Sequence, residues 1–290
     1  MGSLALFDTF FRGKALEHLQ TLIDLALRED GEDLTSQALF PPGTTLTANI
    51  RAKQRTLVAG LPLLPHILES IQGHAHAELL VPEGELVENN SEVARIHGQA
   101  STILQAERII LNFISRLAGI ANLTRSYADR IQGTGVKLLD TRKTTPGMRY
   151  PEKYAVLLGG GCNHRMNLEE MLMLKDNHID QVGSIQTAVR VLRNHYRPCP
   201  PIEVECRSLR DVREAVGARA DRIMLDNMDL SQMAEAISYT LKARLEVEVS
   251  GGVTLENISR IAALGPTYVS VGALTHSAVG ADFSMSIQKS

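Results

Sequence analysis

The chain lacks the features that mark exported, membrane-bound or nucleic-acid-binding proteins. It contains no tryptophan, only 4% aromatic residues and three cysteines, which are Cys162, Cys199 and Cys206. The cysteines have no metal-ligand spacing and do not suggest a disulfide framework, so reduced thiols in the cytoplasm fit best. No apolar run approaches the roughly 18 residues of a membrane span, and the start does not resemble a signal peptide. A net charge of -3 gives no sign of a nucleic-acid or membrane partner.

What is present is enough apolar material for a substantial core, since 44% of the 290 residues are hydrophobic. The first third combines a helical pattern at 15–27 with short alternating segments at 45–50 and 92–96, which predicts a small α+β domain. Ser101 is placed to cap a long helix that runs to about residue 132. This helix would link the first domain to the next.

From residue 136 onward, short apolar strands alternate with amphipathic helices. The expected strands are 136–139, 171–174, 202–204, 222–225, 245–249 and 268–271, and the expected helices are 184–194, 208–216, 231–241 and 255–264. Alternating strands and helices predict a parallel sheet, which is either open or closed into a barrel.

Polar residues and glycines recur where these strands end. They are Asp140, Thr141, Arg142, Lys143, Lys175, Asp176, Glu205, Asp226, Asn227, Ser250, Gly251, Gly252 and Gly272. Polar residues at the carboxyl ends of successive strands are typical of a TIM-like barrel with its site on that face. Six strands are fewer than the usual eight, so the pattern favours an incomplete α/β barrel, with an open doubly wound sheet as the alternative.

The cationic residues between 140 and 178 suit a small polyanionic ligand. Arg142, Lys143 and Lys175 directly follow apolar strands, and glycine runs lie nearby at 159–161. The alternative is that such cations are solvated surface charges, which applies most to Arg149 and Lys153.

The turn at 250–254 leads from a strand towards a helix and is a candidate phosphate site, unless it is only a turn. Glu205 and Asp226 are suited to bind hydroxyls or Mg²⁺, or act as capping and salt-bridging carboxylates.

Longer motifs carry a more specific signal. They are DTRKTTPG at 140–147, KYAV at 153–156, GGGCNHR at 159–165, KDNH at 175–178, EVE at 203–205, MLDN at 224–227, SGGVT at 250–254 and SVGALT at 270–275. In this order and spacing the chain resembles the quinolinate phosphoribosyltransferase family over nearly its whole length, and the first thirty residues match least well.

The resemblance implies a fold and a reaction. The fold would be a small N-terminal α/β sandwich at 1–117 and an incomplete α/β barrel of six or seven strands at 118–275, with the tail 276–290 packing back on the first domain. The reaction would transfer the phosphoribosyl group of phosphoribosyl pyrophosphate (PRPP) to quinolinate with loss of CO₂. It would yield nicotinate mononucleotide and pyrophosphate for NAD biosynthesis.

The resemblance also implies roles for individual residues. The quinolinate carboxylates would be surrounded by Arg142, His164, Arg165 and Lys175, with Arg108 from the partner subunit of a homodimer. Lys143 would lie at the junction with PRPP, and Glu205 and Asp226 would hold ribose hydroxyls and Mg²⁺. The remaining substrate contacts would come from Thr141, Ser250, Gly251, Gly252, Val271 and Gly272. Catalysis would rest on Lys143, Lys175, Glu205 and Asp226.

Three other functions fit some of these residues. A related enzyme acting on nicotinate or another aromatic acid would need fewer cations than this segment provides, because nicotinate has one carboxylate. A Schiff-base aldolase built on Lys175 would not require so many neighbouring cations. A non-catalytic phosphate-binding module would not need Glu205 and Asp226 beside the phosphate turn.

Overall fold

A computed structural model describes residues 3–71 and 73–288 of the chain, which divide into two compact units. Unit 1 comprises Met1–Thr124, Thr144–Gly160 and Leu274–Ser290, and unit 2 comprises Arg125–Lys143 and Gly161–Ala273. This division differs from a single boundary at 117/118, because the segment after Lys143 returns to unit 1 before the second strand of the barrel.

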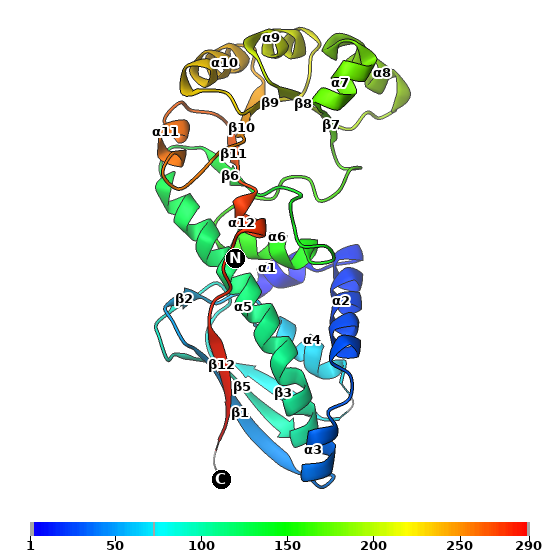
Figure 1. The fold of residues 1–290 in the computed structure, drawn as a ribbon, viewed down its shortest axis with the longest axis vertical. Coiled ribbons are helices and arrows are strands. Elements are labelled where there is room, and N and C mark those ends of the chain that lie inside the picture. The colour runs from blue at the N-terminus through cyan, green and yellow to red at the C-terminus, as the bar shows by residue number, and fades with distance from the viewer. Residues whose placement is uncertain (1–2, 72, 289–290) are drawn as a thin grey trace. The chain divides into compact units, whose positions relative to one another are not determined.

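Unit 1 is built on a four-stranded antiparallel sheet with the order β12-β1-β5-β3 (Figure 1). The strands are β1 (Thr45–Ala52), β3 (Ala75–Leu79), β5 (Glu92–Gln99) and β12 (Phe283–Ile287), and β2 (Thr56–Leu57) pairs separately with β4 (Leu86–Val87). The helices are α1 (Ser3–Phe10), α2 (Lys14–Asp30), α3 (Leu34–Leu39), α4 (Leu63–Glu69) and α6 (Arg149–Leu158). In α2, Ala15, Leu19 and Ile23 are buried, because residues four apart share one face of a helix.

The long helix α5 (Ala100–Arg130) is confirmed, but its expected cap is wrong. Strand β5 ends at Gln99 and the helix begins at the next residue, so Ser101 lies inside its first turn. The chain passes directly from sheet to helix because the Ala100 N–H donates to the carbonyl of Thr44, at 2.9 Å, beside the start of β1. No separate capping residue is therefore needed at this position.

Unit 2 contains one six-stranded parallel sheet with the order β6-β11-β10-β9-β8-β7. All six predicted strands are present, as β6 (Lys137–Leu139), β7 (Leu172–Leu174), β8 (Ile202–Cys206), β9 (Arg222–Asp226), β10 (Glu246–Ser250) and β11 (Tyr268–Ser270). The order never reverses, as it would in a doubly wound sheet, and the first strand pairs with the last. The sheet is an incomplete barrel, open between β6 and β7.

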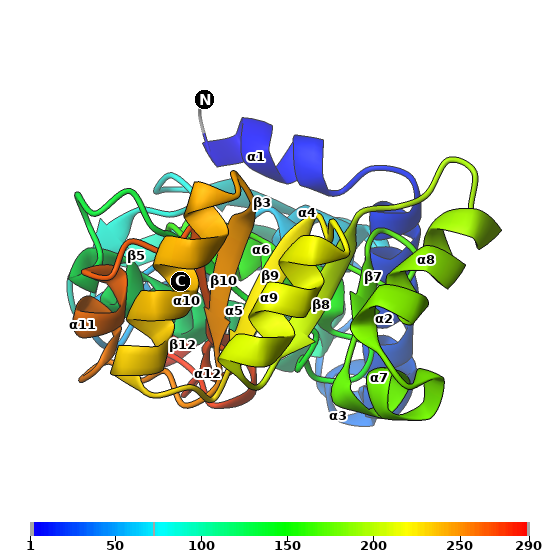
Figure 2. The ribbon, with the colours of Figure 1, turned by 90° about the horizontal axis from the view of Figure 1, so that it is seen from above.

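Helices cover the outer side of this sheet. They are α7 (Asp176–Val182), α8 (Ile185–His195), α9 (Leu209–Gly217), α10 (Leu230–Lys242) and α11 (Ile258–Ala262), and α12 (Ala273–His276) follows β11. Figure 2 shows α9 and α10 in front of β8, β9 and β10, which they contact. The outward-facing strand residues against them, such as Val204, Leu225 and Val247, are fully buried.

The predicted helix starts are accurate to one residue where a serine side chain caps the helix. Ser184 and Ser208, the first residues of two predicted helices, cap α8 and α9, which begin one residue later. The prediction of a helix at 255–264 is too long, because the Asn257 side chain accepts from the Thr254 N–H at 2.8 Å and donates to the Gly252 carbonyl. These bonds form a turn that delays the start of α11 to Ile258.

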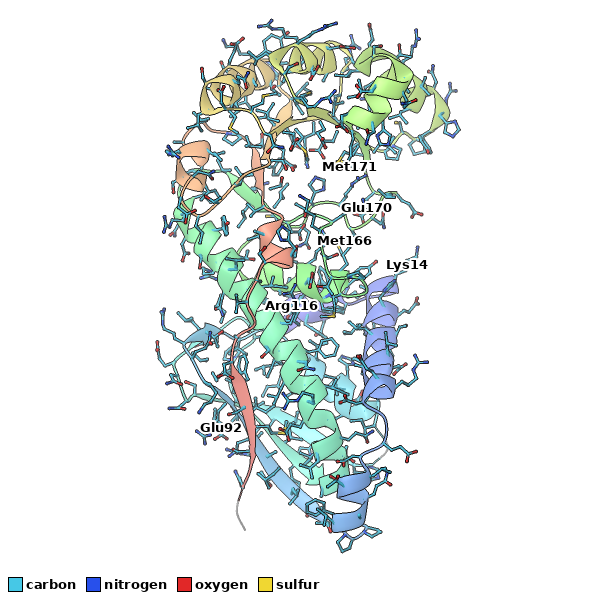
Figure 3. All side chains as sticks on the ribbon, viewed as in Figure 1. Lys14, Glu92, Arg116, Met166, Glu170 and Met171 are labelled. Atoms are coloured by element: carbon cyan, nitrogen blue, oxygen red, sulfur yellow. The ribbon has the colours of Figure 1, made fainter. Side chains whose placement is uncertain are left out.

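The segment that follows Gly160 runs along the opening of the barrel. Cys162 forms a parallel bridge with Leu139, and its N–H donates to the Leu138 carbonyl at 2.7 Å. Further along, the Arg165 guanidinium donates to the Met171 carbonyl at 2.7 Å, immediately before β7. Figure 3 labels Met171 and two earlier residues of this segment. The segment therefore contacts the chain at both strands that border the gap.

Among the residues that the structure describes, no helix is long and apolar enough to cross a membrane.

Candidate active site

The interior of the barrel carries polar side chains in layers, because alternate residues of a strand point to the same side of the sheet. The first layer lies near the amino ends of the strands and contains Arg222, Glu246 and Tyr268. Arg222 forms an ion pair with Glu246 at 2.9 Å and lies 4.2 Å from the centre of the Tyr268 ring. The Tyr268 hydroxyl donates to Glu246 at 2.8 Å, so the polar side chains of this layer are paired with one another.

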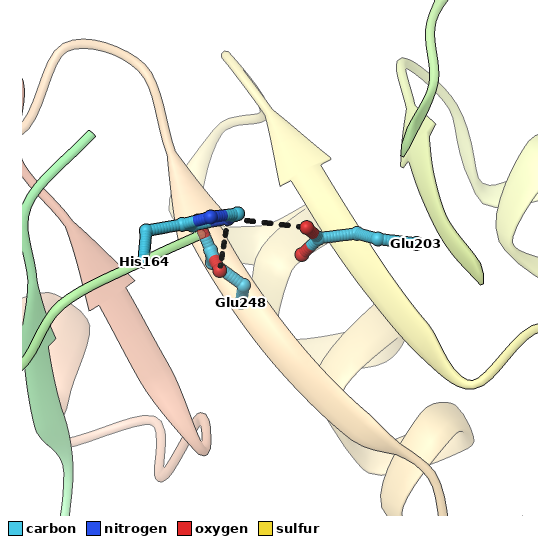
Figure 4. A group of neighbouring side chains, drawn as sticks. All are labelled: His164, Glu203 and Glu248. Atoms are coloured by element: carbon cyan, nitrogen blue, oxygen red, sulfur yellow. Dashed lines mark hydrogen bonds and ion pairs between the residues drawn. The ribbon is translucent and has the colours of Figure 1, made fainter. Parts of the chain in front are cut away.

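The middle layer brings together His164, Glu203 and Glu248, which Figure 4 shows in contact. His164 Nε2 lies 3.1 Å from Glu203 Oε2 and 3.5 Å from Glu248 Oε2. Both glutamates are fully buried, and burial raises the pKa of Glu203 to about 7 and that of Glu248 to about 8. Repulsion from Glu203 adds to the rise at Glu248. These two carboxyl groups therefore retain protons at a pH where an exposed glutamate is ionised.

The third layer lies at the carboxyl ends of the strands and contains most of the expected site residues. Glu205 follows two residues after Glu203 on β8, and its carboxylate is 3.9 Å from Lys175 Nζ. Burial raises the pKa of Glu205, Lys175 opposes the rise, and the nearby Asp226 adds to it. Two carboxylates thus influence each other across adjacent strand ends, which is a suitable oxygen set for a hard cation.

The turn after β10 has a tightly specified backbone. Gly251 has φ +83°, and a Cβ at this position would collide with the side-chain oxygen of Asn227. Asn227 itself has φ +52°, and its N–H donates to the Ser250 carbonyl at 3.2 Å. The phosphate site was expected at a helix N-terminus, but the turn at 255–257 separates it from the short helix α11. Any phosphate binding here must come from the turn itself.

A cavity of 470 Å³ opens beside this third layer. Three of the predicted cations, Arg142, Arg165 and Lys175, line it together with His178. The other lining residues are apolar and are Leu168, Leu172, Met173, Leu174, Val182, Ala188, Val191 and Leu192. The cavity therefore combines a cationic side with an apolar side, as a flat aromatic acid would require.

The two arginines in the cavity lie close enough to influence each other, and one of them has an unpaired nitrogen. Arg142 Nε is buried and has no hydrogen-bond partner among the described residues. Burial lowers the pKa of Arg165, and the like charge of Arg142 lowers it further. Neighbouring guanidinium groups repel each other, so an anion bound between them would be stabilised by both.

The remaining predicted residues have different surroundings. Lys143 is exposed, and its N–H donates to Thr141 Oγ1 at 3.0 Å. Val271 is buried and its N–H donates to the Leu139 carbonyl at 2.9 Å, so its side chain belongs to the core. Gly272 follows it directly at the end of β11. Arg108 is exposed on the part of α5 that belongs to unit 1.

His164 is the predicted site residue that lies in the middle layer of the barrel interior. The resemblance implies that it lies beside a substrate carboxylate, and in the structure its ring nitrogens have protein partners, Glu203 at Nε2 and the Arg165 N–H at Nδ1. The middle layer of glutamates was not anticipated. The two EVE sequences at 203–205 and 246–248 are a usable signal, because their period of two puts both glutamates of each on the same side of a strand.

Comparison with known protein families finds matches over most of the chain. Residues 33–118 match the N-terminal domain of quinolinate phosphoribosyl transferase, and residues 120–286 match its C-terminal domain. The chain belongs to the quinolinate phosphoribosyl transferase family.

Relatives of this family are similar over most of their length. The chloroplastic nicotinate-nucleotide pyrophosphorylase [carboxylating] of Arabidopsis thaliana is 38% identical, covering 93% of this chain and 82% of that protein. A probable nicotinate-nucleotide pyrophosphorylase [carboxylating] of Bacillus subtilis is also 38% identical, covering 88% of each chain. The solved nicotinate-nucleotide pyrophosphorylase of Francisella tularensis has a TM-score of 0.88 at 32% identity, covering 94% of this chain and 96% of that one.

Proposed function

We propose that this chain is an enzyme that transfers the phosphoribosyl group of PRPP to quinolinate with loss of CO₂. The products are nicotinate mononucleotide and pyrophosphate, as needed for NAD biosynthesis. Family membership supports the reaction, and the observation that carries the substrate assignment is the pair of adjacent arginines in a half-apolar cavity. Quinolinate matches this cavity because it has two carboxylates at adjacent positions on the edge of an aromatic ring.

The acid is held by Arg142, Arg165 and Lys175. An arginine binds a carboxylate with two parallel N–H bonds and remains charged at every relevant pH, while lysine adds a compact positive charge. The apolar wall formed by Leu172, Leu174 and neighbouring residues packs against the ring. This arrangement directs the ring nitrogen towards the third layer, where the sugar is bound.

PRPP occupies the carboxyl ends of the strands. The ribose hydroxyls contact Glu205 and Asp226, and the 5'-phosphate lies on the turn formed by Ser250, Gly251 and Gly252. Further contacts come from Thr141, Lys143 and the backbone of Val271 and Gly272. The paired carboxylates fit Mg²⁺, which supplies charge neutralisation for the pyrophosphate oxygens when it is bound with PRPP.

The reaction proceeds in two steps, and one proton is taken up in the second. The ring nitrogen attacks C1 of the ribose, the bond from C1 to the pyrophosphate oxygen breaks, and the positive charge passes to the ring. Lys143 offsets the charge that develops on the leaving group. The cationic ring then accepts the electron pair of the bond to the 2-carboxylate, CO₂ leaves, and C2 takes up a proton from solvent.

The active form is a homodimer in the cytoplasm in which Arg108 of each subunit completes the other subunit's acid pocket. Arg108 is exposed, which leaves it accessible to a second chain. Three apolar side chains that line the cavity, Leu168, Val182 and Val191, are also exposed, and a partner would cover them. All three cysteines are free, which fits a reducing compartment.

The assignment is tested by turnover with PRPP and Mg²⁺, using quinolinate or nicotinate as the acid. We expect CO₂ release and nicotinate mononucleotide from quinolinate, whereas nicotinate reacts at least about tenfold more slowly, because one carboxylate leaves a pocket cation unpaired. The measurement is kcat/KM for each acid by product chromatography. Comparable values for the two acids would overturn the substrate assignment, and absence of both products would overturn the reaction.

A further inference from the structure

The exposed side of the sheet in unit 1 carries two histidines that face each other across neighbouring strands. Thr47 of β1, His97 of β5 and His76 of β3 lie directly opposite one another in a row across three adjacent strands (Figure 1). Both histidines are exposed, whereas the chain neighbours of His97, which are Ile96 and Gly98, are buried on the other side. Because residues directly opposite in antiparallel strands have Cβ atoms about 5 Å apart, the two imidazoles share one small area of surface.

The rings of His76 and His97 lie close to the separation of two ligands on one metal ion. Their centres are 5.6 Å apart and their planes are inclined by 60°. In a tetrahedral zinc site the bonds to histidine nitrogen are about 2 Å long and meet at about 109°, which puts the centres of two bound rings about 5 Å apart. Small rotations of the two exposed side chains would therefore bring one nitrogen of each ring onto a common ion.

Thr47 is placed to orient the ring of His97. Its Oγ1 lies 3.0 Å from His97 Nδ1. A threonine hydroxyl can accept a hydrogen bond from Nδ1–H, and the lone pair of the ring is then on Nε2. Metal-binding histidines usually donate their other ring N–H to a protein group in this way. Among the residues that the structure describes, the His76 ring has no hydrogen-bond partner, so both of its nitrogens are available to an ion.

The charges nearest to the two rings do not oppose a cation. Arg95 lies two residues before His97 on β5 and therefore on the same side of the sheet. It forms ion pairs with Glu78 at 3.3 Å and with Glu92 at 2.7 Å. The positive charge of the guanidinium is thus offset by carboxylates, so its repulsion of a bound metal ion is small.

A cavity of 670 Å³ gives an ion access to both rings. His76 and His97 line it together with His74 and Glu69. His74 lies two residues before His76, on the same side of the extended chain, and adds a third imidazole to this area of surface. Glu69 adds a negative charge, which favours entry of a cation.

We propose that His76 and His97 form a binding site for Zn²⁺ on the exposed side of the unit 1 sheet, with water completing the coordination. Imidazole ligands suit zinc, copper and nickel ions, whereas Mg²⁺ prefers oxygen ligands. The site lies within unit 1 and contains none of the residues assigned to phosphoribosyl transfer. It therefore adds to the proposed function and does not depend on it.

Isothermal titration of the chelator-treated full chain with ZnCl₂ tests the site. We expect one zinc ion per chain that is lost in the double variant His76→Ala/His97→Ala. Each single substitution should weaken binding at least about tenfold, because the ion then loses one of two linked ligands. Thr47→Val should weaken it about tenfold, since it removes the partner of the His97 Nδ1–H. An excess of MgCl₂ should not displace the zinc.

His195→Ala is the matched control, because His195 is an exposed histidine at the end of α8 in unit 2. It should bind zinc as the wild type does, and circular dichroism verifies that every variant is folded. Wild-type zinc affinity and stoichiometry in the double variant would overturn the proposal, since the ion would then bind elsewhere. One ion for every two chains, with zinc-dependent association in analytical ultracentrifugation, would also overturn it by placing the ion between chains.

Thermal unfolding provides a second measurement that does not depend on turnover. An ion that bridges β3 and β5 binds only the folded sheet, so ZnCl₂ should raise the Tm of the wild type and leave that of the double variant unchanged. An equal rise in both proteins would contradict the proposal. If zinc binds as expected but quinolinate and PRPP give no product, the proposed function fails and the zinc site stands.

Discussion

At the scale of single residues, Gly251 is a position in the candidate site where the backbone leaves no room for a side chain. Its φ of +83° is unfavourable for any other residue except asparagine or aspartate, and a Cβ would meet Asn227. We expect Gly251→Ala to lower the free energy of unfolding by about 1 to 3 kcal/mol. It should also raise KM for PRPP, because the turn must move. Urea denaturation and PRPP saturation kinetics measure the two effects.

Gly217 provides the control for this substitution. It is the last residue of α9, and a Cβ there would have open space around it. Gly217→Ala should leave the stability unchanged or raise it by about 0.5 to 1 kcal/mol, since alanine favours a helix. Equal stability of the two variants would show that the turn after β10 tolerates a side chain.

The sequence identified site residues that lie at the ends of predicted strands. It did not identify residues that are brought together by contacts between distant parts of the chain. Lys175, Glu205 and Asp226 were found because each follows or ends an apolar strand. The proximity of His164 to Glu248 could not be anticipated, since 84 positions separate them and only the folded barrel brings them together. Lys153 is fully buried, which contradicts its expected place on the surface.

At the scale of elements, β12 joins residues near the C-terminus to the sheet of unit 1. Phe283 pairs with Ala52 of β1 and its side chain is buried. We expect Phe283→Ala to lower the free energy of unfolding by about 3 to 5 kcal/mol, because it leaves a large cavity in the core. Chemical denaturation followed by circular dichroism measures the change.

Ile287, at the other end of the same strand, is the control. Its side chain is partly exposed, so Ile287→Ala should lower the free energy of unfolding by less than about 1.5 kcal/mol. If both variants lost the same stability, the strand would contribute through its backbone pairing, and the burial of Phe283 would be unimportant.

Elements with a strong local pattern were predictable and those defined by distant contacts were not. The six barrel strands are short apolar runs between polar ends, so their positions follow from local composition. Strand β12 has a weak pattern of its own and exists because β1, more than 230 positions earlier, offers an edge. The length of α11 was overestimated because the turn held by Asn257 has no periodic signal.

At the scale of the whole molecule, the proposed dimer makes each active site depend on two chains. Arg108→Ala and Lys175→Ala homodimers should both be nearly inactive, since every site lacks one residue. In a mixed dimer, one site receives both substitutions and the other receives neither. Equimolar unfolding and co-refolding should therefore restore about a quarter of the wild-type activity, as half of the dimers are mixed and each has one intact site.

Each variant refolded alone provides the baseline for this experiment, and native mass spectrometry verifies that mixed dimers form. Recovery above both baselines supports a site shared between subunits. Mixed dimers without recovered activity would mean that Arg108 acts within its own subunit or has no role in binding the acid.

The charged layers inside the barrel also bear on how the sheet assembles during folding. A strand that slips by two residues keeps its apolar side outward and its polar side inward, so burial of apolar surface alone does not oppose the slip. In the native pairing Arg222 lies opposite both Glu246 and Glu203. A slip of β10 that moves Glu248 from opposite Met224 to opposite Asp226 would separate Glu246 from Arg222 and bring two carboxylates together, at a cost of several kcal/mol. The polar interior therefore disfavours an alignment of the strands that an aliphatic interior would not distinguish.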